Sequence, residues 1–249
     1  MIEVRNISKS FDGQEVLKNI STTFEKGKTN LIIGQSGSGK TVLMKCCIGL
    51  LDTDEGEIKF DGRRFSNLKG TNQKNVRKEM GVLFQGGALF DSYTVEENVM
   101  FPLNMFTDNT LEEKRARVNE VLTHVNLENV NSKYPAEISG GMIKRVAIAR
   151  AIALNPKYLF CDEPNSGLDP KTAEVIDELI SELTEKFQMT TVINTHDMNS
   201  VLQIGQKIAY LYKGQLWWEG DHQGILETTN EELNDFVFST ELTRRLKHR

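Results

Sequence analysis

The sequence predicts an α/β fold with a mostly parallel β-sheet at its core. Apolar strand patterns end at Ile33, Phe84, Asp162 and Asn194, and helical patterns separate them. A glycine-rich run over residues 34–41 follows the first of these strands directly and opens a helical pattern. Strands that alternate with helices are typical of a sheet with helical crossovers. The 249 residues are enough for a large core.

The N-terminal segment predicts a β lobe beside this core. Residues 1–33 contain short strand patterns that Gly13 and Gly27 interrupt, and Gly56 and Gly62 enclose one more. Glycines at such points favour turns between strands. We expect the lobe to cover the base of a nucleotide whose phosphates bind at the glycine-rich run.

The glycine-rich run has the composition and position of a phosphate-binding loop. Its glycines let the backbone turn tightly and bring several N–H groups to a polyphosphate, and the N-terminus of the next helix adds partial positive charge. We expect Lys40 at the β- and γ-phosphates, and the Thr41 hydroxyl suits Mg²⁺. The alternative is a chance glycine-rich turn. The predicted nucleotide-binding residues here are Gly34, Ser36, Gly37, Ser38, Gly39, Lys40 and Thr41.

Residues 85–154 predict a helical insertion, because no strand pattern interrupts them. Thr94 with Glu97, and Thr110 with Glu113, have the spacing of capping boxes, in which a threonine and a glutamate cap a helix N-terminus reciprocally. Two helices are therefore expected to begin just after these threonines.

A second glycine-rich helix entry lies at Ser139-Gly140-Gly141-Met142, before a helical run over residues 143–153. A serine hydroxyl and glycine N–H groups at a helix N-terminus form another anion site. A plain N-cap also accounts for Ser139, because serine is a favoured capping residue.

Paired carboxylates follow the buried strand pattern of residues 158–161. Ligand-binding groups of open α/β sheets lie at such strand ends. Asp162 is the natural partner of Mg²⁺, and Glu163 is placed to orient and deprotonate an attacking water. A solvated turn is the alternative, which the phosphate loop makes less favourable.

These segments, in this order, resemble the ATPase subunit of an ABC transporter. Ile138–Met142 resembles the family's LSGGQ signature, although Met142 replaces the usual glutamine. Gln85 resembles the glutamine of the Q-loop, and His196 resembles the switch histidine. The resemblance extends from residue 1 to about residue 226, and its further matches are the D-loop segment Ser166–Asp169 and Phe11, which stands where the family stacks an aromatic ring on adenine.

The resemblance implies an ABC-type ATPase domain over residues 1–226. A RecA-like core with an antiparallel β lobe would comprise residues 1–84 and 155–226, and an α-helical subdomain would comprise residues 85–154. ATP and Mg²⁺ are the implied cofactors. The implied site residues are Glu163, His196 and Gln85 for catalysis, and Thr41, Gln85 and Asp162 for the metal.

The resemblance also implies partners. Two copies would form a head-to-tail homodimer, in which Ser139, Gly140 and Gly141 of one copy bind the ATP held by the phosphate loop of the other. An integral membrane permease would be the second partner, with a small regulatory subunit as a further candidate. The expected location is the cytoplasmic face of the bacterial inner membrane, peripheral through the permease.

The segment after Gln85 indicates a subtype. Residues 84–91, 94–99 and 101–103, together with Met142, resemble the Mla/Mce-type ATPases, which drive phospholipid transport and whose complexes contain an Mce-domain protein. Two alternatives stay open: a motor for another substrate, such as an amino acid, and a soluble ABC protein with no transport role.

Composition agrees with a globular ATPase. The formal net charge is −5, and no apolar run approaches the ~20 residues that span a bilayer. Mild acidity gives no reason to expect nucleic-acid binding. Residues 227–249 extend beyond the resemblance and have an imperfect apolar stripe followed by a basic end. Three alternatives fit this segment: a solvated tail, a helix that contacts a second protomer, or a segment near anionic lipids.

Overall fold

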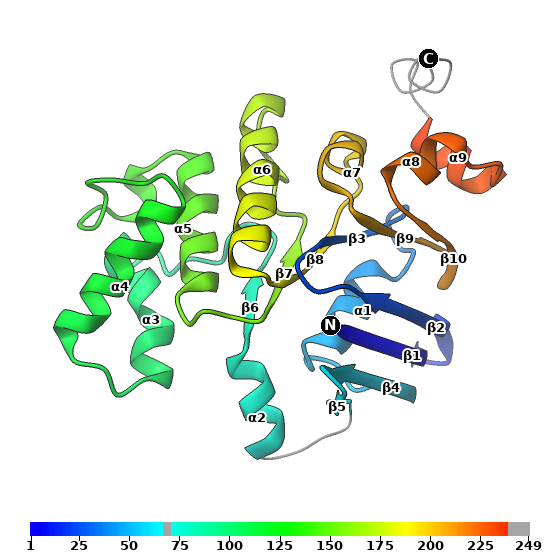
Figure 1. Ribbon diagram of the computed structural model, residues 1–249, viewed down its shortest axis with the longest axis horizontal. Helices are drawn as coiled ribbons and strands as arrows, with labels where there is room; N and C mark the ends of the chain where they lie inside the picture. Colours follow the sequence, from blue (N-terminus) through cyan, green and yellow to red (C-terminus); the bar gives the residue numbers. More distant parts are fainter. Residues whose placement is uncertain (67–70, 239–249) are drawn as a thin grey trace.

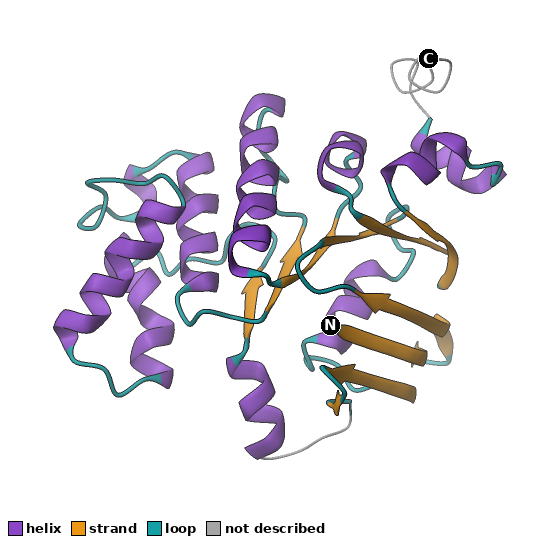
Figure 2. Cartoon of the chain, viewed as in Figure 1, coloured by secondary structure: helices purple, strands orange, loops and turns teal. Residues whose placement is uncertain are grey.

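The computed structural model describes residues 1–66 and 71–238, which form two β-sheets and the helices around them (Figure 1). The larger sheet has six strands in the order β10-β9-β3-β8-β7-β6, and the smaller has four in the order β2-β1-β4-β5. Figure 2 shows a group of helices at one end of the molecule and the smaller sheet at the other, with further helices on the faces of the larger sheet.

Five strands of the larger sheet are parallel, and β10 pairs antiparallel with β9 at one edge. The predicted mostly parallel core is therefore confirmed. The strands are β3 (Thr29–Ile33), β6 (Met80–Leu83), β7 (Tyr158–Asp162), β8 (Thr190–Asn194), β9 (Lys207–Tyr212) and β10 (Gln215–Gly220).

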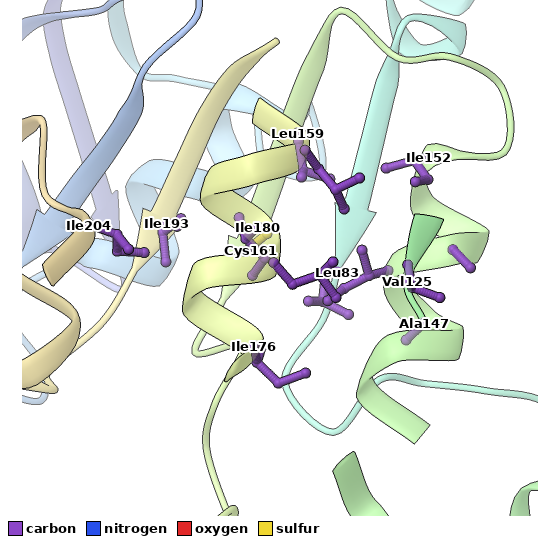
Figure 3. Packing of buried hydrophobic residues seen from close by; sticks show 14 of the residues in the cluster. Leu83, Val125, Ala147, Ile152, Leu159, Cys161, Ile176, Ile180, Ile193 and Ile204 are labelled. Carbon is purple, nitrogen blue, oxygen red and sulfur yellow. The ribbon is translucent and has the colours of Figure 1, made fainter. Parts of the chain in front are cut away.

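Alternate side chains of these strands enter two hydrophobic cores, one on each face of the sheet, because successive residues of a strand point to opposite faces. Leu31 and Ile33 belong to the core under the helices, whereas Ile32 belongs to the core shared with the β lobe. Figure 3 shows the first core, where Cys161 packs beside Ile180. Burial on both faces explains why these strands are continuously apolar.

The predicted antiparallel β lobe is confirmed. It consists of β1 (Ile2–Phe11), β2 (Gln14–Phe24), β4 (Glu55–Phe60) and β5 (Arg63–Arg64), all paired antiparallel. Helix α1 (Lys40–Cys47) lies between the two sheets in Figure 1 and buries Leu43, Met44 and Cys47 in the shared core. The glycine-rich run that precedes α1 thus stands where the two sheets meet.

The helical subdomain contains α3 (Val95–Phe106), α4 (Leu111–His124), the short 3-10 helix Pro135–Glu137 and α5 (Gly140–Ile152). Both capping boxes form as predicted: Thr94 accepts from the Glu97 N–H, and Thr110 accepts from the Glu113 N–H. Helix α2 (Thr71–Lys78) precedes β6.

Helices α6 (Pro170–Phe187) and α7 (Met198–Ile204) cover the face of the larger sheet opposite α1 (Figure 1). Helices α8 (His222–Glu227) and α9 (Glu231–Val237) follow β10. Phe236 of α9 stacks on Tyr210 of β9 with ring centroids 5.4 Å apart. The start of the C-terminal extension is therefore helical and packs on its own chain, while the basic end lies outside the described residues.

Within residues 1–66 and 71–238, no helix combines the length and the apolar composition needed to cross a membrane.

Candidate nucleotide-binding and hydrolytic site

Three glycines of the phosphate loop have positive φ, and at two of them a side chain would also meet neighbouring atoms. Gly34 has φ 148°, and a Cβ there would lie 2.3 Å from the Leu211 carbonyl oxygen. Gly39, the N-cap of α1, has φ 104°, and a Cβ would lie 2.7 Å from Leu17 Cδ2. A side chain at either position would displace the loop, so glycine is required at both.

Lys40 opens α1 and turns back into the loop. Its Nζ donates to the carbonyl oxygens of Gly34 at 2.7 Å and Gln35 at 3.0 Å. Burial lowers the pKa of Lys40 because it disfavours the charged form, and the carboxylates of Glu163 and Asp162 oppose this shift. The loop therefore holds a buried cation among backbone groups.

The same loop fits a polyphosphate. Ser38 Oγ is buried and has no hydrogen-bond partner among the described residues. Together with the Lys40 ammonium and the N-terminus of α1, it gives the loop donors that suit an anion. The donors of the loop therefore suit the phosphates of ATP.

Oxygen ligands for Mg²⁺ meet beside the loop. Thr41 Oγ1 lies 3.5 Å from Asp162 Oδ1, at the carboxyl end of β7. Asn194, at the end of the neighbouring strand β8, donates to the same Asp162 oxygen at 3.0 Å. A hydroxyl and a carboxylate suit a cation that otherwise takes phosphate oxygens and water. Thr41 and Asp162 are thus the residues that would hold Mg²⁺.

Glu163 is the centre of a second cluster. Its Oε1 lies 2.9 Å from His196 Nδ1, and its Oε2 accepts from Gln85 Nε2 at 3.2 Å. The Gln85 amide also lies 3.5 Å from Ser166 Oγ. The three residues predicted to be catalytic therefore come together from the end of β7, the segment after β6 and the segment after β8.

The backbone at Glu163 is left-handed, with φ 48°. This conformation costs a non-glycine residue roughly 1–2 kcal/mol and persists only where neighbouring groups hold it. The Glu163 N–H donates to the Asn194 carbonyl at 3.0 Å, and the Ser166 N–H donates to the Glu163 carbonyl at 3.2 Å. Both neighbours therefore hold the carboxylate in place.

Much of the loop and the Glu163 cluster line a cleft of about 1300 Å³. Its walls include the loop residues Ser36, Lys40 and Thr41 as well as Gln85 and the Glu163–His196 pair. Phe11 is not among the lining residues; it is partly exposed near the end of the β lobe, with Lys9 Nζ 5.5 Å from its ring centroid. The predicted role of Phe11 against adenine remains a prediction.

Ser139, Gly140 and Gly141 lie elsewhere and do not line this cleft. Ser139 is the N-cap of α5, and its Oγ accepts from the Met142 N–H at 3.3 Å. Figure 1 shows α5 and α1 on opposite sides of strands β6 to β8. Within one chain, the two predicted phosphate-binding segments therefore do not form one site.

Two asparagines of the site were not predicted. Asn194 positions Asp162, and its place at a strand end beside β7 was a usable signal. Asn165 lines the cleft and joins a buried network described below. Its contacts come from α6 and α7, which sequence spacing alone does not bring to residue 165.

Comparison with known proteins defines the class. The family model described as "ABC transporter" matches residues 17–166. The chain therefore belongs to the ABC transporter family, as an ATP-binding cassette with ATPase activity.

Curated relatives carry transport names. A protein named "Methionine import ATP-binding protein MetN", from Clostridium tetani, is 36% identical over 97% of this chain and 76% of its own length. The protein of the same name from Campylobacter jejuni is also 36% identical, over 95% of this chain and 75% of its own length. A protein from Mycobacterium bovis named "Probable ribonucleotide transport ATP-binding protein mkl" is 35% identical over 95% of this chain and 66% of its own length.

Solved structures share the fold. The ATP-binding cassette MJ0796, in a dimeric post-hydrolysis state bound to ADP and Pi, matches with a TM-score of 0.81 and 33% identity, covering 89% of this chain and 99% of that one. The cbiO1 protein from Clostridium perfringens, part of an ABC transporter complex, matches with a TM-score of 0.85 and 27% identity over 99% of this chain and 97% of that one. The ABC cassette fold is thereby confirmed.

Proposed function

We propose that two copies of this chain form a head-to-tail dimer that hydrolyses ATP and drives a membrane permease. The observation that carries the proposal is the separation of the two phosphate-binding segments. The loop and Glu163 line the cleft, while Ser139 lies outside it. A second copy would bring its own Ser139 segment over the cleft, and the dimeric MJ0796 cassette supports this arrangement.

The residues of the cleft divide the chemistry between them. Lys40 and the loop N–H groups hold the β- and γ-phosphates, and Glu163 accepts a proton from the attacking water. Gln85 and His196 contact the two oxygens of the Glu163 carboxylate and fix its direction. Thr41 and Asp162 would hold Mg²⁺, with Gln85 as the third proposed ligand, and the ion would supply positive charge against the phosphates. Binding closes the dimer only through contacts that the γ-phosphate makes better in the closed state.

An exposed aromatic cluster is the proposed contact with the permease. Phe90 and Tyr93 are about 40% exposed, and the Phe90 ring lies 4.9 Å from Phe101 and 5.1 Å from Tyr93 between ring centroids. The cluster follows Gln85 closely in the chain, and Gln85 contacts the Glu163 carboxylate. A displacement of the cluster by the permease would therefore be transmitted to Glu163 through one short segment. A permease contact of this kind supports the proposed location at the cytoplasmic face of the bacterial inner membrane.

For the transported molecule, we infer an amino acid, with methionine as the first candidate. The methionine-import names of relatives at 36% identity support it. Phospholipid is the second candidate, which the Mla/Mce-like sequence of residues 84–91 favours, and it would add an Mce-domain protein to the complex. The three relatives described above bear neither an Mla nor an Mce name, so the comparison supports the amino-acid candidate better.

Glu163→Gln tests the hydrolytic role. The amide cannot accept the proton, so phosphate release should fall at least about 100-fold, while binding of a fluorescent ATP analogue stays within about three-fold. Glu182→Gln, an exposed position outside the cleft, is the control and should leave turnover unchanged. Undiminished phosphate release by Glu163→Gln would exclude Glu163 as the base.

The same variant separates the substrates when it is the sole copy in cells. Loss of labelled methionine uptake with unchanged outer-membrane phospholipid supports the amino-acid importer. Normal methionine uptake with altered phospholipid distribution supports the lipid candidate instead. Cells that retain both properties would indicate a motor for a different substrate or a chain without a transport role.

A further inference from the structure

Three polar side chains are buried where α6, α7 and the loop after β7 meet. Asn165 is 8% exposed, Asp177 of α6 is 2% exposed and Ser200 of α7 is 1% exposed. None of them belongs to the motifs that define the nucleotide site. Buried polar groups of this kind must satisfy one another, because burial without a partner is costly.

The three side chains form a closed hydrogen-bond triangle. Asn165 Nδ2 donates to Ser200 Oγ at 2.9 Å and to Asp177 Oδ2 at 3.1 Å. Ser200 Oγ donates to the same Asp177 oxygen at 2.5 Å. Asp177 Oδ2 is thus the shared acceptor, whereas Asp177 Oδ1 is buried without a partner among the described residues.

The triangle connects the two segments that carry the catalytic pair. Asn165 stands two residues after Glu163, and its Nδ2 lies 3.4 Å from Asp197 Oδ2, on the residue directly after His196. Ser200 lies in the first turn of α7, whose N-cap is Asp197. The buried Asn165 side chain therefore links the loop that carries Glu163 to the segment that carries His196.

This connection matters because the Glu163–His196 contact joins two loops. Their 2.9 Å separation depends on the left-handed backbone of Glu163, which the surrounding structure must maintain. The hydrogen bond to Asn194 fixes the strand side of Glu163. Asn165 fixes the other side, because it ties the loop to α6 and α7.

The triangle is charged at neutral pH. Burial raises the pKa of Asp177 to about 6, and the Asp197 carboxylate adds to the rise, while the hydrogen bonds from Ser200 and Asn165 oppose it. The groups that face Asp177 are Asp197 from the start of α7 and the Cys161 thiol of β7. A carboxylate in this position costs more than apolar side chains that fill the same volume. The carboxylate instead fixes geometry, because one of its oxygens accepts from both Asn165 and Ser200 and so orients both side chains.

We propose that Asn165, Asp177 and Ser200 are positioning residues: they keep the Glu163 carboxylate and the His196 ring in contact, in the geometry that hydrolysis needs. The proposal rests on the proposed function, because it assigns the network an effect through Glu163. The network contributes to the catalytic rate rather than to nucleotide affinity, since it does not hold the phosphate loop.

Asn165→Ala is the first test. Circular dichroism at the assay temperature should first show that the variant is folded like wild type. We then expect kcat for ATP hydrolysis to fall about ten-fold, because small displacements of a catalytic group have effects of this order. The KM for ATP should stay within about two-fold. Gln203→Ala is the matched control: its Nε2 bonds Glu178 Oε1 at 3.1 Å, so it joins the same two helices on their exposed side. Its kcat should be unchanged.

Asp177→Asn is the second variant, and it tests the network even if Asn165→Ala does not fold. Its amide oxygen replaces the shared acceptor and its NH₂ group takes the place of the unpartnered oxygen, so the shape is kept while the charge is lost. We expect kcat to fall about three-fold, between wild type and Asn165→Ala.

A double-mutant cycle separates positioning from a general structural effect. Asn165→Ala should lower the residual rate of Glu163→Gln by less than two-fold, because residues that act through one another are non-additive. A full ten-fold loss in that background, or an unchanged kcat in Asn165→Ala, would overturn the proposal. If Glu163→Gln alone retained wild-type turnover, the proposed function would fail instead.

Discussion

At the scale of single residues, Asp177 shows how burial becomes a pH-dependent stability. Its pKa rises from 3.8 to about 6 on folding, because burial disfavours the carboxylate. A carboxyl with a raised folded pKa stabilises the protein fully below its unfolded pKa, and that contribution is lost as pH rises through about 6. The loss is on the order of 3 kcal/mol.

Asp177→Asn should remove this dependence. Relative to wild type, we expect the variant to gain about 2 kcal/mol of unfolding free energy between pH 4.5 and pH 7.5, since its amide has no charge to bury. Urea unfolding at several pH values measures the difference. Glu178→Gln, on the exposed side of the same helix, should change it by less than about 0.5 kcal/mol. A constant difference across the pH range for Asp177→Asn would contradict the raised pKa.

Residue-scale prediction found the candidate site where chemistry is encoded in adjacent residues, and the roles of these residues stay predictions. Lys40 and Thr41 follow from the phosphate loop, and Asp162 and Glu163 follow from a strand end. The meeting of Glu163 with His196 was implied by family resemblance rather than by spacing. Asn165 was not predicted, because its partners lie on two helices whose packing no local pattern specifies.

At the scale of secondary structure, local signals placed the helix starts of the subdomain. The capping boxes at Thr94 and Thr110 lie one residue before α3 and α4, because each box satisfies backbone N–H groups within four residues. Helix α2 lacked such a signal, and its sequence is strongly polar. Helix α9 depends on tertiary contact, since its Phe236 stacks on Tyr210 of the core.

Thr110→Ala tests the capping contribution. Removal of the hydroxyl that accepts from Glu113 should lower the unfolding free energy by about 1 kcal/mol, because one N–H at the start of α4 loses its partner. Chemical denaturation provides the measurement. Thr123→Ala, late in the same helix, is the control and should cost about 0.5 kcal/mol or less. Equal losses in the two variants would show that the cap has no special role.

At the scale of the whole molecule, the fold places the two predicted phosphate-binding segments apart. The loop lies between the two sheets, and Ser139 begins a helix of the subdomain at the other end of the larger sheet (Figure 1). The mostly parallel sheet and the β lobe could be predicted because strand patterns and family resemblance agree. In the proposed dimer, the surface that completes the site belongs to a second copy, so the packing within one chain does not bring the two segments together.

Sedimentation of Glu163→Gln with and without ATP and Mg²⁺ tests this central claim most directly. We predict a monomer without nucleotide and a dimer with it, because ATP bridges the loop of one copy and Ser139 of the other. Ser139→Arg in the same background should still bind ATP but stay monomeric, since the bulky cation obstructs the shared site. A chain that binds ATP and remains monomeric with Ser139 intact, or a dimer that Ser139→Arg leaves unchanged, would contradict the account.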